Sequence, residues 1–477
     1  MRDQTASGLA TVRPPAARLE PDAIGVAQDT VIGMASSAPA ASVGLTLAAL
    51  AAATAYGSGP IIVLTAVPML VIANAYRRLN MWNANCGASF EWVGRAINPY
   101  LGFLTGWLMI AAYIIATVSG VEVLGPSALA VFGAAATSVR DNIAIATALG
   151  LVMLAIAVAG IKITARTQVG IALAEYLILI GFAAVGLAAV LAHHPGTLPV
   201  SKGWLSLSGI GGHGSAAAGF LAAVFMFTGW DGTVYVNEEV RHRRTNPGRA
   251  AVLAVVFLAV IYAFATVGLQ GVVSPGRLQA NSPDALVYIA GALDGGGAAK
   301  LMALALALSV IATTGTGIVL TARIIYGMAS YRALPQFLAN VSARFATPVA
   351  ASVLTGLAII ALSWTYLLAT SVQNAFNDVV AVTGLLFAVF YILTALATLA
   401  YYRRRLLRNA WDALILGALP AGAAGFLAWI VVKSLQAAPA PQIWSLAGVA
   451  AAGVALMLLA RFGLRSPFFA IRREHDA

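Results

Sequence analysis

The stretch Phe227-Thr228-Gly229-Trp230-Asp231-Gly232 lies inside an apolar run that extends over residues 216–236. Two glycines bracket a tryptophan and an acid at the depth where a helix of about 20 residues would cross the middle of a membrane. Glycine weakens a helix because its backbone readily leaves the helical conformation. The pattern predicts a membrane helix that is interrupted near its centre and carries a carboxyl group at the interruption.

The composition of the chain indicates the same environment. The 477 residues are 60% hydrophobic and 9% charged, whereas soluble domains average about 25% charged residues. The apolar runs are about 20 residues long and lack the alternating pattern of barrel strands, so they favour a bundle of membrane helices. The single cysteine, Cys86, excludes an internal disulfide and a multi-cysteine metal site. Residues 1–22 lack the apolar core of a signal peptide, so we expect them to form a cytoplasmic tail.

Hydropathy predicts twelve spans. They lie near residues 24–54, 60–76, 100–131, 143–160, 169–191, 216–236, 251–273, 301–328, 350–369, 379–402, 413–432 and 443–459. The chain then divides into an N-terminal tail (1–22), helices one to five (23–193), an extracytoplasmic loop (194–215), helices six to ten (216–402), a basic loop with helices eleven and twelve (403–465), and a C-terminal tail (466–477).

The positions of the basic residues predict the orientation. With the N-terminus inside, 23 of the 28 Lys and Arg residues fall in cytoplasmic segments, and five fall outside. Cytoplasmic loops carry the Lys/Arg excess, so we expect both termini to lie in the cytoplasm and the chain to cross the cell membrane many times. Because topology accounts for the net charge of +11, we expect no nucleic-acid partner.

The first span contains a second predicted interruption. It includes Ile32-Gly33-Met34-Ala35-Ser36-Ser37-Ala38-Pro39, and proline both removes a backbone donor and clashes with the preceding turn. Each interruption falls in the first helix of a set of five, and the two sets have opposite orientation. Interrupted helices at matching positions of inverted repeats indicate a transporter's binding site.

Several motifs resemble the amino acid/polyamine/organocation permease superfamily. They are residues 29–35 in the first span, 87–95 and 102–107 around the second and third, 227–231, 238–239 and 246–250 around the sixth, and Arg323, Tyr326, Met328, Ala329, Leu334, Pro335, Thr347 and Pro348 around the eighth. The resemblance covers roughly residues 22–402. It implies a LeuT-type fold of five plus five helices in an inverted repeat, with helices one and six broken and two helices added at the C-terminus.

The resemblance also implies a substrate site at the two interruptions. Its candidate residues are Ala35, Ser36, Ser37, Phe227, Thr228, Gly229, Trp230 and Asp231. Many family members have a glycine-rich pair at the first interruption, where backbone amides hold the carboxylate of the substrate. This chain has Ala35-Ser36-Ser37-Ala38-Pro39 instead, so hydroxyl groups and freed amides would have to serve.

Polar residues at membrane depth suggest how transport could be coupled to an ion. An ionisable group there is costly and indicates function, which makes Asp231, Glu175 and Glu122 candidates for proton coupling. Thr313 and Thr314 in the eighth span are candidates for a sodium site, because hydroxyl groups there ligate the ion in sodium-coupled relatives. Packing or hydrogen bonding within the helix is the alternative for Glu175, Glu122 and both threonines.

Four charged residues near the cytoplasmic ends of spans one, six and eight suggest an inner gate. They are Asp29, Glu238, Glu239 and Arg323. Pairing of the acids with Arg323 or with nearby loop arginines would close the transporter on that side. The alternative is that these four residues are ordinary charged residues at helix ends and take no part in a gate.

These features favour a carrier over an enzyme. The sequence has no cluster of metal-ligating residues, no cofactor-binding pattern and no P-loop. We expect a secondary active transporter that moves amino acids, as its small-molecule substrate, across the cytoplasmic membrane by alternating access and is coupled to protons. A carrier for polyamines or other organic amines, and a sodium-coupled amino acid symporter, remain the alternatives.

Overall fold

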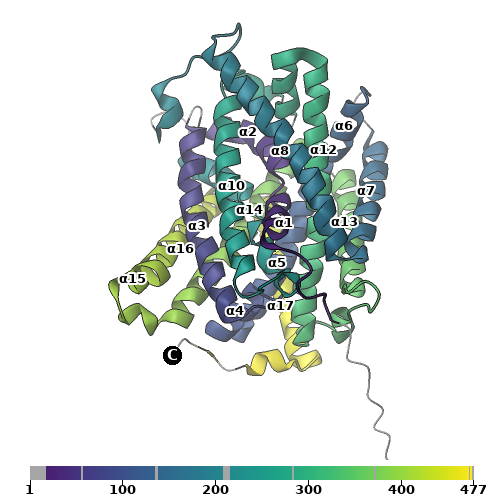
Figure 1. Cartoon of the computed structure of the whole chain (residues 1–477), viewed down its shortest axis with the longest axis vertical. Helices are drawn as coiled ribbons and strands as arrows, with labels where there is room; N and C mark the ends of the chain where they lie inside the picture. The colour runs from purple at the N-terminus through teal and green to yellow at the C-terminus, as the bar shows by residue number, and fades with distance from the viewer. Residues whose placement is uncertain are drawn as a thin grey trace, which may run out of the picture.

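A computed structural model describes residues 18–54, 57–134, 138–207, 215–281, 284–369, 372–471 and 473–474, with the side chains of Glu122, Ala369 and residues 372–378 left out of the description. In these ranges twelve helices are long and apolar enough to cross a membrane. They form one upright bundle (Figure 1). The predicted class, an all-α protein with twelve transmembrane helices, is confirmed. Residues 1–17 of the predicted N-terminal tail lie outside the described residues.

The spans are built from the following helices. They are α1 (Val26–Ser36), α2 (Pro39–Thr54), α3 (Ser58–Trp82), α5 (Pro99–Ser119), α6 (Val121–Val131), α7 (Val139–Ala159), α8 (Ile161–Leu191), α9 (Ala216–Met226), α10 (Asn246–Leu269), α12 (Ala285–Ser330), α13 (Val349–Ala369), α14 (Val372–Tyr402), α15 (Ala410–Asp412), α16 (Leu419–Ala437) and α17 (Ala440–Leu458). Shorter helices include α4 (Ser89–Ala96) and α11 (Pro275–Ala280).

The first and sixth spans are not continuous helices, and Gly120 also separates α5 from α6 in the third span. The first span ends as α1 at Ser36 and begins again as α2 at Pro39, and Ala38 between them has a positive φ of 47°. The sixth span ends as α9 at Met226 and continues, after Phe227–Gly229, as the short 3-10 helix η3 (Trp230–Val234). Proline at position 39 cannot donate the hydrogen bond that would join α1 to α2.

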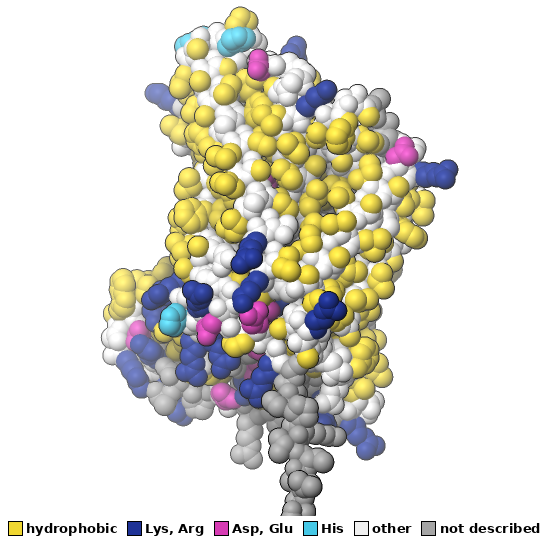
Figure 2. Space-filling model, turned by 45° about the vertical axis from the view of Figure 1, so that its right-hand side comes forward, with side chains coloured by type: hydrophobic (Ala, Val, Ile, Leu, Met, Phe, Trp, Pro, Cys, Tyr) yellow, Lys and Arg dark blue, Asp and Glu magenta, His cyan; other side chains and the backbone are white. Residues whose placement is uncertain are grey.

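The interrupted first span occupies the centre of the bundle. In its most apolar stretch 89% of the residues are buried, compared with 11% in the last span. The last span, which contains α17, therefore has little protein around it. The apolar side chains on the outside of the bundle form a wide surface (Figure 2), as expected where lipid rather than water is the solvent.

One end of the bundle carries most of the visible Lys and Arg side chains (Figure 2). We call it the basic end; α4 and the C-terminal residues also lie there (Figure 1). At this end the segment before α1 is tied to the segment after η3. Ile24 donates to the carbonyl oxygen of Glu239 at 3.1 Å, and Arg241 donates to that of Ile24 at 2.9 Å.

Part of the predicted C-terminal tail also packs against the basic end. The ring of Phe468 is fully buried and stacks on Phe90 of α4 at 4.1 Å between ring centroids. A Cβ atom at Gly94 would lie 2.6 Å from Cζ of Phe468, so only glycine leaves room for this ring. Further along, Glu474 forms an ion pair with Arg95. These contacts fix the tail beneath α4.

Candidate functional site

A small cavity lies between the two interruptions. Its walls come from α1, α2, α5, α9 and α12, and they comprise Ser36, Ser37, Ala38, Ala41, Ser42, Leu45, Ala116, Thr117, Ser119, Gly120, Phe225, Thr228, Val310 and Thr313. About 30 Å³ of it is open, which is room for one or two water molecules. The structure therefore shows this cavity in a contracted form that is too small for an amino acid.

The interruptions touch each other beside this cavity. Gly229 has a φ of +101°, and a Cβ atom there would lie 2.6 Å from the carbonyl oxygen of Ser36. This backbone conformation and this close approach both require glycine. Of the residues predicted for the substrate site, Ser36, Ser37 and Thr228 line the cavity, whereas Ala35, Phe227, Gly229, Trp230 and Asp231 are not among its lining residues.

Glu175 of α8 reaches the start of α2. Its Oε1 accepts hydrogen bonds from the backbone amide of Ala40 at 2.8 Å and from the Ser309 hydroxyl group of α12 at 2.7 Å. Its Oε2 is buried and has no partner among the described residues. The first amides of a helix attract negative charge, which explains why a carboxyl group is held here. Glu175 thus connects α8, α2 and α12 beside Ala41 and Val310, which line the cavity.

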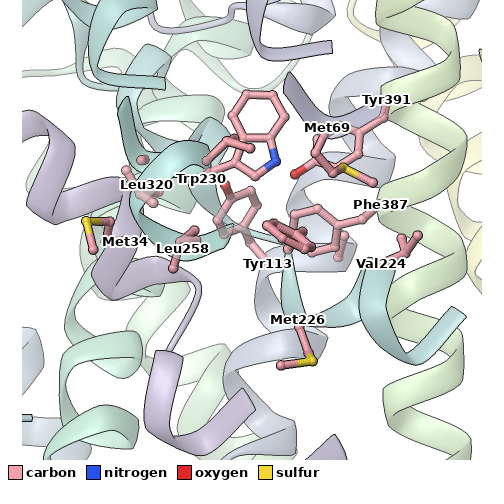
Figure 3. Packing of buried hydrophobic residues seen from close by; sticks show 14 of the residues in the cluster. Met34, Met69, Tyr113, Val224, Met226, Trp230, Leu258, Leu320, Phe387 and Tyr391 are labelled. Carbon is pink, nitrogen blue, oxygen red and sulfur yellow. The ribbon is translucent and has the colours of Figure 1, made fainter. Parts of the chain in front are cut away.

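Asp231 is fully buried in a cage of aromatic rings. Its Oδ1 accepts a hydrogen bond from Tyr391 of α14 at 2.7 Å, and its Oδ2 accepts one from Tyr235. The ring of Trp230 stacks on Tyr391 with 5.2 Å between centroids. Figure 3 shows Trp230 and Tyr391 close together with Tyr113. The tyrosines satisfy both oxygens, and Asp231 does not line the cavity in this conformation.

The aromatic cage extends to α3 and α4. Tyr76 of α3 lies edge-on to Trp230 at 5.1 Å, and its hydroxyl group accepts a hydrogen bond from Ser89 of α4 at 3.0 Å. Tyr113 of α5 donates to the carbonyl oxygen of Gly229 at 3.3 Å. These tyrosines join the sixth-span interruption to four other helices. They were missed by the sequence analysis, although tyrosines inside otherwise apolar spans were a visible signal.

The two threonines predicted for a cation site differ in their positions. Thr313 lines the cavity, and its hydroxyl group can donate to the carbonyl oxygen of Ala35 at 3.1 Å or to that of Ser309 at 2.9 Å. Thr314 donates to the carbonyl oxygen of Val310 within its own helix at 2.8 Å and does not line this cavity. Among the described residues, no group of three His, Cys, Asp or Glu side chains could hold a metal ion.

Two of the four residues predicted for an inner gate pair with each other. Arg323 of α12 forms two hydrogen bonds of 3.0 Å with Glu239, one from Nε and one from Nη2, and both side chains are fully buried. Glu238 accepts a hydrogen bond from the backbone amide of Cys86 at 3.1 Å. Burial raises the pKa of Glu238 above its usual value of 4.5. The carboxyl group of Asp29 has no partner in the described part of the chain. Arg323 therefore pairs with Glu239 and not with Asp29.

The side chain of Glu122, the third candidate for proton coupling, lies outside the described residues.

The family model of amino acid permeases matches residues 28–460. The chain belongs to the amino acid permease family. Permeases are transporters and not enzymes, which confirms the expectation of a multi-pass membrane carrier.

Curated relatives match this permease over a limited stretch. The mouse Asc-type amino acid transporter 1 is 29% identical over 138 residues, which is 29% of this chain and 26% of that protein. The human large neutral amino acids transporter small subunit 2 is 28% identical over 142 residues, which is 30% of this chain and 26% of that protein. The alignments thus span about a quarter of the length of these relatives.

Solved structures share the LeuT-type fold of the permease. A manganese transporter variant from Eremococcus coleocola superposes with a TM-score of 0.63 at 13% identity, covering 92% of this chain and 94% of that one. The structure of MhsT in complex with L-phenylalanine superposes with a TM-score of 0.57 at 14% identity, covering 86% of this chain and 99% of that one. At such low identity the likeness concerns the fold alone.

Proposed function

We propose that this permease is a secondary active transporter that moves amino acids across the cytoplasmic membrane by alternating access, coupled to protons. Membership of the amino acid permease family supports the substrate class. The cavity between the two interrupted spans supports the binding position, since such interruptions form substrate sites in transporters of this architecture.

The conformation supports alternating access. The basic end, which we place in the cytoplasm with both termini, is closed by the buried Arg323–Glu239 pair and by the backbone contacts between Ile24 and the Glu239–Arg241 segment. The cavity lies on the other side of the interruptions, along α2 and α9. Opening towards the cytoplasm would have to break these contacts and would give the substrate a second exit.

The observation that carries proton coupling is the presence of two buried carboxyl groups at the interruptions. Asp231 belongs to η3, and Glu175 binds the first turn of α2. Each could take up and release a proton as the half-helices move. Glu122 in α6 stays a third candidate from the sequence. Sodium coupling has less support, because only Thr313 of the two candidate threonines lines the cavity, and Thr314 donates within its own helix.

The partnered amides at the first interruption favour a second candidate, a carrier for polyamines or other organic amines. The amides of Ala40 and Ala41 already donate to Glu175 and to Ser309, so neither is free for the carboxylate of a substrate. The two candidates share the transport mechanism and differ in the substrate.

Uptake into proteoliposomes tests the coupling. The reconstituted full-length permease should accumulate its substrate under an inward proton gradient without sodium. It should not do so under a sodium gradient without a pH difference. Uptake that requires sodium and ignores pH would contradict proton coupling and would favour Thr313 as an ion ligand. A thermal-shift screen against amino acids and amines supplies the substrate, because a bound ligand stabilises the folded state.

A further inference from the structure

We propose that Glu175 acts as a built-in carboxylate that sets substrate selection: it fills the anion position at the start of α2, so the cavity favours ligands that present an amino group and lack a free α-carboxylate. The proposal rests on the transport function above, and of its two substrate candidates it favours organic amines over free amino acids.

The start of α2 is where an anionic group of a ligand would be expected. The helix has 16 residues; Ala38 directly before it and Ala41 in its first turn both line the cavity. The N-terminus of a helix attracts anions through its unpaired amides and its positive dipole end. In this chain that position already holds the carboxyl group of Glu175, bound to the Ala40 amide at 2.8 Å.

The neighbouring amides of the interruption are also partnered. Ser37 and Ala38 donate to the carbonyl oxygens of Met34 and Ala35, and Ser42 donates to that of Ala38. The amide of Ala41 donates to the Ser309 hydroxyl group at 3.1 Å. That hydroxyl group in turn donates to Glu175 at 2.7 Å. Pro39 has no amide hydrogen. The interruption therefore offers no free amide for a second carboxylate.

Six of the seven hydroxyl groups that line the cavity, all but that of Ser36, are committed as donors to backbone carbonyl groups. Backbone carbonyl groups accept from Ser37 (3.2 Å), Ser42 (2.6 Å), Thr117 (2.8 Å), Ser119 (2.7 Å), Thr228 (2.7 Å) and Thr313 (2.9 Å). A hydroxyl group that donates to a carbonyl group keeps its lone pairs as acceptors. The residues lining the cavity include no Lys or Arg. The cavity is thus rich in acceptors and poor in donors, which suits an ammonium group and not a carboxylate.

Charge adds to this preference. When Glu175 is ionised, a free carboxylate at the start of α2 would be repelled by it in a place of low polarity, where repulsion between like charges is strong. An amino group there meets hydroxyl oxygens instead. Removing the side chain of Glu175 would free the Ala40 amide and leave the Ser309 hydroxyl group able to donate elsewhere, which recreates an anion site.

Matched ligand pairs test the proposal on the full-length protein. The pairs are L-alanine and ethylamine, L-ornithine and putrescine, and L-phenylalanine and phenethylamine, each with the amide of the amino acid as a third member. Thermal shift against concentration in detergent measures binding, and competition for uptake in proteoliposomes measures transport. One of these side chains should fit the binding site best. For the ligands that carry it, we expect the amine and the amide to bind at least tenfold more tightly than the amino acid.

Glu175→Ala should then improve binding of the amino acid relative to its amine by tenfold or more, and Glu175→Asp should act in the same direction because its shorter side chain withdraws from Ala40. Tyr176→Phe, which changes the next residue of α8, serves as the control and should leave the ratio unchanged. If Glu175→Ala does not fold, the proposal is still tested by Glu175→Asp and by the ratio of amine affinity to amino acid affinity in the wild-type protein.

Two results would overturn the proposal. One is a wild-type protein that binds the amino acid more tightly than its amine and its amide in every pair that it recognises. The other is a Glu175 variant that weakens the members of a pair equally. Absence of binding and uptake for a broad panel of amino acids and amines would instead contradict the transport function itself, so the two failures can be told apart.

Discussion

The hydroxyl group of Tyr391 donates a hydrogen bond of 2.7 Å to Oδ1 of Asp231, and it joins α14 to the interruption of the sixth span. Both side chains are fully buried, so water cannot replace this bond if it is lost. The carboxyl group and the tyrosine must therefore separate, or move together, whenever the sixth span rearranges.

Tyr391→Phe should destabilise the protein by about 1–3 kcal/mol, because it leaves a buried acceptor without its donor while the stacking on Trp230 is retained. Thermal unfolding in detergent measures the change. Tyr100→Phe, which removes a hydroxyl group from a side chain that is 40% exposed, is the control and should change stability by less than about 0.5 kcal/mol. Equal stability of the two variants would show that the Tyr391 bond contributes nothing.

Asp231→Asn should leave the bundle folded and abolish accumulation driven by a pH gradient, because asparagine cannot carry the proton. It can still accept from one of the two tyrosines through its single amide oxygen. If Asp231 carries only the proton, exchange of internal for external substrate should persist. Accumulation under a pH gradient and exchange of internal for external substrate should both be measured in the same batch of proteoliposomes. Wild-type accumulation by the variant, at equal expression, would return Asp231 to a structural role.

Arg323→Met should destabilise the protein by about 3–5 kcal/mol, because it leaves the buried carboxylate of Glu239 without its partner. The double variant Arg323→Met/Glu239→Gln should recover part of that loss. Lys162→Ala, which breaks a pair with Glu20 whose side chains are 50% and 43% exposed, should cost at most about 1 kcal/mol. Thermal unfolding of the three variants and of Glu239→Gln alone is the measurement. If the stability lost in the double variant equals the sum of the losses for Arg323→Met and Glu239→Gln alone, the two residues do not stabilise each other.

Glu238 should make stability depend on pH. Its folded-state pKa lies above the usual 4.5 because burial disfavours the charged form, so the folded state binds this proton more tightly than the unfolded state does. The contribution of Glu238 to stability is therefore present below pH 4.5 and is lost as pH rises through the raised pKa. Glu238→Gln should flatten this part of a curve of melting temperature against pH. An identical curve for wild type and variant would exclude the effect.

Much of the architecture could be predicted from the sequence because the bilayer imposes strong rules. Apolar runs of about 20 residues have few structural choices, and the twelve predicted spans match those of the structure. The region after residue 284 shows what hydropathy does not resolve. There the helical segment from Ala285 is joined to the eighth span through a turn at Asp294 and Gly295, where the latter has a φ of +73°.

The partners of the charged residues could not be predicted in this way. Glu175 and Ala40 are separated by 135 residues, and their contact depends on how α8 crosses the start of α2. The sequence likewise placed Asp29 and Glu239 near Arg323, but only packing decides which carboxyl group meets the guanidinium. The tyrosines around Asp231 could not be assigned to it from the sequence, because hydropathy does not show which neighbouring span a side chain faces.

The fit of the Phe468 ring against Gly94 has an evolutionary consequence. Any side chain at position 94 would occupy the space of the ring, although the two residues lie 374 positions apart in the chain. Natural variation at the two positions should therefore be correlated. Relatives that keep an aromatic residue at the end of the chain should keep glycine in the α4 segment, and larger residues at that position should accompany a C-terminus that is shorter or follows another course.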